Sequence, residues 1–172
     1  MLQTFNPIVV AAVAACAGTS ALVDLRIRRV PNALTLGIAA LGVALATSGH
    51  GTVSLWAALA GCAVGLLAML PAFVIGATGG GDVKLVAALG TLLGPRGVLF
   101  AVLYTAIAGG LLALLVAARR QRLRETMERT AALISTRGAN AAEIEHGSSD
   151  NRFAYAPAIA LGSLAAALTA AY

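Results

Sequence analysis

The chain has 172 residues, of which 59% are hydrophobic and 11% are charged, and it carries a formal net charge of +5. This composition excludes an ordinary soluble domain of the same size. It indicates an all-α, polytopic integral membrane protein with a single domain over residues 1–172. The positive charge does not indicate a nucleic acid partner, because the basic residues cluster at the ends of apolar segments. Cys16 and Cys62 lie inside apolar runs and are interpreted as small hydrophobic residues, not as metal ligands.

Six apolar segments follow in chain order, and most are near the ~20 residues needed to cross a bilayer core. No Lys or Arg precedes the first segment, which is therefore interpreted as a retained transmembrane helix and not as a signal peptide. The fourth segment is short, at about 16 Å of helix. The six predicted transmembrane helices cover residues 7–23, 33–48, 53–75, 83–93, 98–118 and 153–171.

Between the fifth and sixth segments, charged residues alternate with apolar residues that recur at helical spacing. These apolar residues are Leu123, Met127, Ala131 and Ile134. The pattern predicts an amphipathic helix over residues 119–137 that lies at the membrane interface, with its basic side chains near anionic headgroups. Residues 139–151 are expected to form a polar loop, so that residues 119–152 make up the cytoplasmic part of the domain.

The basic residues define the expected orientation of the chain in the bilayer. They lie between the first and second segments, after the third, and between the fifth and sixth, and only Arg96 lies on the opposite side. The side rich in Lys and Arg is cytoplasmic by the positive-inside rule. We therefore expect a multi-pass protein with both termini outside the cytoplasm.

Two of the seven acidic residues fall at the ends of membrane segments, and the others lie in the long cytoplasmic segment. Asp24 ends the first helix and Asp82 begins the fourth, both on the cytoplasmic side, so we expect them to meet across the helix bundle. An acidic residue near a bilayer is costly and marks a candidate functional site. The alternatives are an ordinary interfacial carboxylate for Asp24 and a helix N-cap for Asp82.

Three consecutive glycines, Gly79, Gly80 and Gly81, directly precede Asp82. Glycines free the backbone from the helix, and we expect these three to let an extended substrate strand approach the acid. Two close carboxylates share one proton, so one member can take a proton from water while the other hydrogen-bonds a peptide carbonyl. The pair is therefore suited to amide hydrolysis without a metal or another cofactor.

Four further residues near these acids are candidates for supporting roles. Pro31 is expected to restart the chain after the basic loop and to rigidify the approach to the second helix. Asn32 and Thr35 are expected to cap that helix, and the alternative is that they orient Asp24. Lys84 lies two residues from Asp82, which directs it to a different helix face, and it is interpreted as an interfacial anchor.

Three stretches carry a resemblance to a known family, namely Asp24 to Thr35, Gly79 to Leu85, and Tyr155-Ala156-Pro157-Ala158. Through them the chain resembles the bacterial prepilin peptidases, which are GxGD-type membrane aspartyl proteases, and most of all their short Flp/Tad-pilus form. The resemblance implies that Asp24 and Asp82 are the catalytic pair and that a prepilin or pseudopilin is the substrate. It also implies the bacterial inner membrane, a cytoplasmic active site and contact with pilus assembly machinery.

Longer members of this family carry a cysteine-rich cytoplasmic domain and also methylate the new terminus. No such insertion separates the first two helices here, so no methyltransferase activity is expected. Three other functions remain open at this point. They are an archaeal-type preflagellin peptidase, a small transporter in which the same two aspartates bind protons or cations, and a non-catalytic membrane assembly factor.

Overall fold

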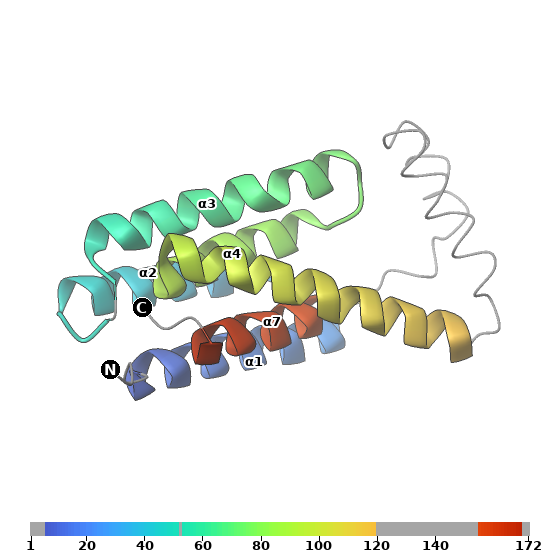
Figure 1. Ribbon diagram of the computed structural model, residues 1–172, viewed down its shortest axis with the longest axis horizontal. Helices are drawn as coiled ribbons and strands as arrows, with labels where there is room; N and C mark the ends of the chain where they lie inside the picture. Colours follow the sequence, from blue (N-terminus) through green and yellow to red (C-terminus); the bar gives the residue numbers. More distant parts are fainter. Residues whose placement is uncertain (1–5, 52, 120–154, 170–172) are drawn as a thin grey trace.

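The computed structural model describes residues 6–51, 53–119 and 155–169, and within these ranges it contains helices and no strands. This part of the chain confirms the all-α prediction. Figure 1 shows an elongated bundle in which α1 begins and α7 ends at the same end of the molecule. The helices are α1 (Pro7–Ile27), α2 (Asn32–Thr47), α3 (Leu55–Val74), α4 (Gly80–Arg119) and α7 (Ala156–Thr169).

Two predicted elements cannot be compared with this bundle. The amphipathic helix predicted over residues 119–137 and the loop predicted over residues 139–151 lie outside the described residues, apart from Arg119 at the end of α4. Both stay predictions.

The ends of α1 follow directly from its sequence. The Asn6 side chain accepts a hydrogen bond from the Ile8 amide at 3.0 Å, and Pro7 occupies the first helical turn, where its missing N–H is no loss. Arg28 ends the helix in the left-handed conformation, with a φ of 54°, and its amide donates to the Asp24 carbonyl at 2.7 Å. The helix therefore continues past its predicted end at residue 23 and contains Asp24 in its last turn.

The predicted fourth and fifth segments form one element, α4, with a sharp kink at Gly94. Its φ of 69° and ψ of 179° lie in a region that side chains rarely adopt, and Pro95, which follows, has no amide to donate. Figure 1 shows that the chain reverses direction here, so the two arms of α4 are antiparallel. The expected loop at residues 94–97 is thus replaced by a single non-helical residue, and the first arm begins at Gly80 instead of residue 83.

Close contact between α3 and α4 depends on glycine. A Cβ atom at Gly61 would overlap the carbonyl oxygen of Gly90, and a Cβ at Gly90 would overlap the carbonyl oxygen of Gly61. Gly65, one turn further along α3, faces Val86 and Ala87 at distances that also leave little room for a side chain. Small residues allow two backbones to approach in this way, which strengthens van der Waals packing inside a membrane.

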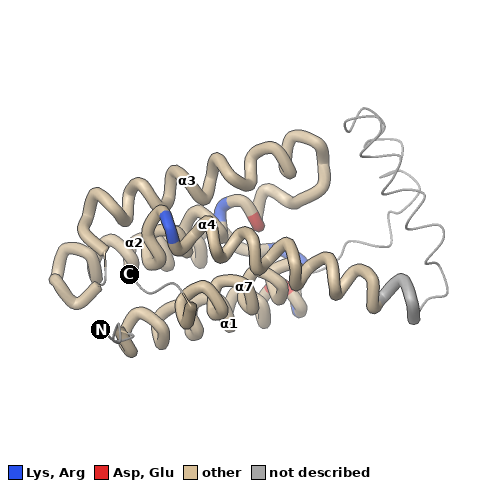
Figure 2. Tube along the Cα trace, in the orientation of Figure 1, with Lys and Arg blue, Asp and Glu red and all other residues tan. Residues whose placement is uncertain are grey.

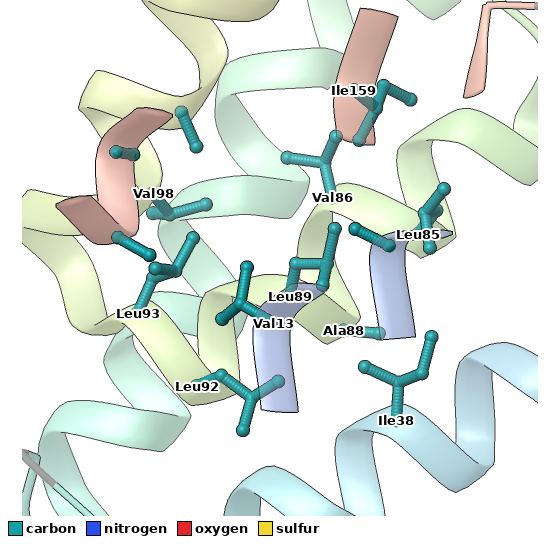
Figure 3. Packing of buried hydrophobic residues seen from close by; sticks show 14 of the residues in the cluster. Val13, Ile38, Leu85, Val86, Ala88, Leu89, Leu92, Leu93, Val98 and Ile159 are labelled. Atoms are coloured by element: carbon teal, nitrogen blue, oxygen red, sulfur yellow. The ribbon is translucent and has the colours of Figure 1, made fainter. Parts of the chain in front are cut away.

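The first arm of α4 forms the centre of the bundle. Its residues Leu85, Leu89 and Leu93 are at most 1% exposed, and Figure 3 shows them surrounded by buried side chains from other helices, among them Val13 of α1 and Ile159 of α7. Ile38 of α2 also belongs to this cluster. Asp82 precedes the buried run directly, so the packing of the core fixes the position of the acid at its end.

Within the described ranges, three helices are long and apolar enough to cross a membrane, namely Pro7–Ile27, Leu55–Val74 and Gly80–Leu115, the last of which includes both arms of α4. The apolar helices α2 and α7 are shorter, with 16 and 14 residues. Many large apolar side chains point outwards, including Trp56 at 80% exposed and Val74 at 75%. This outer surface fits a lipid environment. The number of six crossings stays a prediction, since three of the helices meet the length criterion.

Candidate active site

Asp24 lies on the buried face of α1, which packs against α7. Only 7% of its surface is exposed, and its Oδ2 accepts a hydrogen bond from the Ala156 amide at 3.4 Å. Ala156 is the first residue of α7, where backbone amides have no partner within the helix. The beginning of the last helix therefore contacts the carboxylate at the end of the first.

Asp82 is the third residue of α4, and its side chain turns back to the start of its own helix. Its Oδ2 accepts from the Gly79 amide at 3.3 Å, while the Asp82 and Val83 amides donate to the Gly79 carbonyl at 3.0 and 3.3 Å. The Asp82 side chain at the third helical position thus makes one half of a capping box, and Gly79, the capping residue, contributes only backbone groups. The alternative prediction of Asp82 as the N-cap is wrong by three positions, although the carboxylate does satisfy a free amide.

The fold brings Asp24 and Asp82 to the same end of the bundle. Figure 2 shows the acidic positions of α1 and α4 toward the end where α1 stops and α4 starts. A Cβ atom at Gly81, the residue before Asp82, would lie 3.5 Å from the Cβ of Val30, so the start of α4 lies against the connection that follows α1 and Asp24. The two acids thus lie at the same end of the bundle, as the sequence predicted, and their action as a catalytic pair stays a prediction.

Contrary to the prediction from the sequence, the three glycines before Asp82 are not all free of the helix, because only Gly79 precedes α4. Gly80 and Gly81 are already helical, and neither they nor Gly79 have a positive φ. A Cβ at Gly81 would lie 3.5 Å from the Cβ of Val30, and a Cβ at Gly80 would lie 3.4 Å from the Phe73 ring. Both are ordinary contacts, so the helix itself does not require glycine at either position. Their proposed role in substrate approach stays a prediction.

The predicted cap of α2 does not form. Asn32 is the first residue of the helix, the N-cap is Pro31, and no side chain caps this end. Thr35 donates instead to the carbonyl of Asn32 at 3.0 Å. Pro31 is extended, with φ −64° and ψ 142°, and its carbonyl accepts from the amides of Leu34 and Thr35, so it does begin the helix as expected.

The Asn32 side chain contacts α4. Its Oδ1 accepts a hydrogen bond from the Nζ of Lys84 at 3.1 Å, which ties the first turn of α2 to the first turn of α4. Lys84 is exposed and lies on a different face of α4 from Asp82, as its spacing predicted. The bond therefore joins the two helices beside the acid. It could not be predicted from the sequence, because the two residues are 52 positions apart.

Sequence reasoning attached no role to Tyr155 and Ala156, although both belong to a stretch that matched the family pattern. Ala156 contacts Asp24 through its backbone amide, and the type of its side chain gives no indication of this contact. Within the described ranges, no group of three His, Cys, Asp or Glu side chains lies close enough to hold a metal ion.

An all-helical bundle with an apolar outer surface and two acids at one end defines a membrane protein with a candidate acid–base site. The model of the type IV leader peptidase family matches residues 11–114, and the chain therefore belongs to this family, whose members are proteases. The match includes both Asp24 and Asp82 and ends within α4, before α7. No curated protein and no solved structure gave a significant match.

Proposed function

We propose that the protein is an aspartic endopeptidase that removes the basic leader peptides of type IV or Flp-like prepilins. It acts at the cytoplasmic face of the bacterial inner membrane. The observation that carries this proposal is that two acids from distant parts of the sequence lie at the same end of the bundle, Asp24 in the last turn of α1 and Asp82 in the first turn of α4. Membership of the type IV leader peptidase family supports the same substrate class.

The chemistry follows from two acids that share one proton. The ionised member removes a proton from a water molecule as that water attacks the scissile carbonyl carbon. The protonated member hydrogen-bonds the carbonyl oxygen and later supplies the proton for the leaving amine. The amides of Ala156 and Gly79 each occupy one carboxylate oxygen of Asp24 and Asp82. The second oxygen of each carboxylate carries out these transfers.

The distribution of basic residues supports a cytoplasmic site. Arg26, Arg28, Arg29 and Lys84 belong to the end of α1, the connection to α2 and the start of α4, beside the two acids. Arg96 follows the kink at the other end of the bundle. A prepilin leader is short and basic and remains in the cytoplasm, while the first mature residues form an apolar helix, so cleavage occurs at this membrane boundary.

The proposal is tested with Asp24→Asn and Asp82→Asn, assayed on a prepilin in detergent micelles. Asn keeps an oxygen that accepts from the Ala156 or Gly79 amide, so the structural contact survives while the proton transfer is lost. Each variant is expected to lower the cleavage rate by about 100-fold or more. Asp150→Asn makes the same chemical change in the predicted polar loop and is expected to cleave at the wild-type rate.

Cleavage by either site variant at the wild-type rate would contradict the two-carboxylate mechanism. A wild-type protein that cleaved no prepilin would contradict the peptidase function itself. In that case, proton flux in liposomes that required both aspartates would support the transporter alternative.

A further inference from the structure

The connection between α1 and α2 contacts the start of α4 at two residues, one on each side of Asp82 in the sequence. Before the acid, a Cβ atom at Gly81 would lie 3.5 Å from the Cβ of Val30 and 3.7 Å from its amide nitrogen. After the acid, the Nζ of Lys84 donates a hydrogen bond to the Oδ1 of Asn32 at 3.1 Å. One apolar and one polar contact therefore attach this connection to the part of α4 that carries the acid.

The same connection is attached to the end of α1 that carries Asp24. The Arg28 amide donates to the Asp24 carbonyl at 2.7 Å, and the backbone continues through Arg29 to Val30. Val30 is half-buried and packs against the hydrophobic core. A short stretch of backbone therefore leads from the first acid to the contacts that hold the start of α4, where the second acid lies.

The Asn32 side chain has no role at the end of its own helix. Asn32 is the first residue of α2, and no side-chain hydrogen bond caps this end. The side chain is exposed, so burial does not explain it either, and alanine has a higher helix propensity than asparagine. What Asn32 contributes and alanine would not is the bond to Lys84.

We propose that Asn32 is a positioning residue, which holds the start of α4 through Lys84 and so sets the place of Asp82 relative to Asp24. Two carboxylates act together on one carbonyl group only at a suitable separation, and a displacement of about 1 Å can lower a rate about 100-fold. The inference rests on the proposed function. It gives Lys84 a role beyond that of the interfacial anchor that the sequence predicted.

Two single variants and their combination test the bond in the prepilin cleavage assay. Asn32→Ala removes the acceptor and leaves the charge of Lys84 in place, whereas Lys84→Met removes the donor. Each is expected to lower kcat about tenfold, the lower end of the range for a hydrogen bond to a charged group, because this bond is exposed. The KM is expected to stay within roughly twofold. The double variant is expected to lower kcat no further than either single variant, because both changes break the same contact.

Tyr104→Phe is the matched control. Within the described ranges, one other hydrogen bond joins side chains of different helices, and it links the hydroxyl groups of Tyr104 in α4 and Thr169 in α7 at 3.2 Å. This bond is also exposed, but Thr169 ends α7, whereas Ala156, which contacts Asp24, begins it. Tyr104→Phe is therefore expected to leave kcat unchanged. Thermal melting of every variant in detergent measures helix assembly separately from catalysis.

A wild-type kcat for Asn32→Ala would overturn the inference, even beside an impaired Lys84→Met, because Lys84 would then act through its charge alone. A lower melting temperature without a fall in kcat would also overturn it, since the bond would then serve assembly alone. The same holds for a rise in KM without a fall in kcat, and for an equal loss of kcat in Tyr104→Phe.

Additive losses in the double variant would contradict a shared contact and would overturn the inference as well. A wild-type protein without prepilin cleavage would overturn the proposed function, and this inference with it. Equal, non-additive losses of kcat in Asn32→Ala and Lys84→Met, beside an unchanged Tyr104→Phe, would support it.

Discussion

At the scale of single residues, some glycines allow close helix packing, as at Gly61 and Gly90, whereas others have no packing role. Gly80 and Gly81 are helical and have ordinary contacts at their missing Cβ positions, so packing explains neither of them. Glycine loses more backbone entropy on folding than alanine does, so alanine would be expected to fit at least as well in the first turn of α4. Glycine at these two positions beside a candidate catalytic acid is explained if the substrate occupies the space of the missing Cβ atoms.

Gly81→Ala is therefore expected to preserve or slightly raise the melting temperature while it lowers kcat/KM by about tenfold. The added methyl group has room beside Val30 in the free protein, but it projects into the proposed path of the substrate strand. Cleavage assays and thermal melting on the same preparation measure the two effects. Gly37→Ala, in an open position on α2, is the control and should change neither quantity. An unchanged kcat/KM for Gly81→Ala would show that substrate does not need this space.

The acids themselves show what sequence can predict at this scale. Asp24 and Asp82 were identifiable because a carboxylate at a membrane boundary is costly and rare. The partners of these acids were not identifiable, since Gly79 and Ala156 contribute backbone amides, and every non-proline residue has one. Asn32 was misassigned for a related reason. Its type is typical of helix caps, but tertiary contact with Lys84 determines where its side chain lies.

At the scale of helices, the contact between α3 and α4 is made directly between the two backbones. Gly61 and Gly90 face each other backbone to backbone, and Gly61 also lies against Gly94 at the kink. The contact therefore fixes the position of the first arm of α4, which carries Asp82 at its tip. The apolar segments predicted both helices and a reversal between residues 93 and 98, but not that one residue, Gly94, makes the reversal, because a Gly-Pro pair is equally typical of a longer loop.

Gly90→Ala is expected to destabilise the protein by about 1–3 kcal/mol, since the new methyl group would force the two backbones apart. The corresponding measurement is the melting temperature in detergent, which should fall, together with the yield of folded protein. Gly18→Ala provides the control, because nothing lies within 4 Å of that position on α1. A melting temperature for Gly90→Ala as high as that of the control would contradict the close backbone contact.

At the scale of the whole molecule, the helices alternate in direction along the chain, as Figure 1 shows. This alternation agrees with the predicted six segments, although α2, α7 and the first arm of α4 span only about 21–24 Å at ~1.5 Å per residue. A bilayer core is ~30 Å thick and can thin around short segments. Helix length alone therefore does not decide which of the short segments cross a membrane, whereas the order of the apolar segments predicted the alternating directions of the described helices.

The orientation of the molecule can be measured by cysteine labelling. Arg29→Cys and Arg96→Cys, both exposed positions, are introduced after Cys16 and Cys62 have been replaced by alanine. A membrane-impermeant reagent added to intact cells is expected to label position 96, and position 29 only after the membrane has been opened. The expectation follows from the excess of basic residues on the side of position 29. The opposite labelling pattern would place the acids on the face that a cytoplasmic leader cannot reach.

The single-residue reversal at Gly94 also has a consequence for biosynthesis. The first arm of α4 is shorter than the ~30 Å core of a bilayer, and almost no hydrophilic segment separates it from the second arm. The two arms should therefore leave the translocation channel together, as a helical hairpin with Arg96 at its leading tip. Asp82 would then be drawn to the membrane boundary only when the second arm has been synthesised, so the order of synthesis determines when this acid arrives.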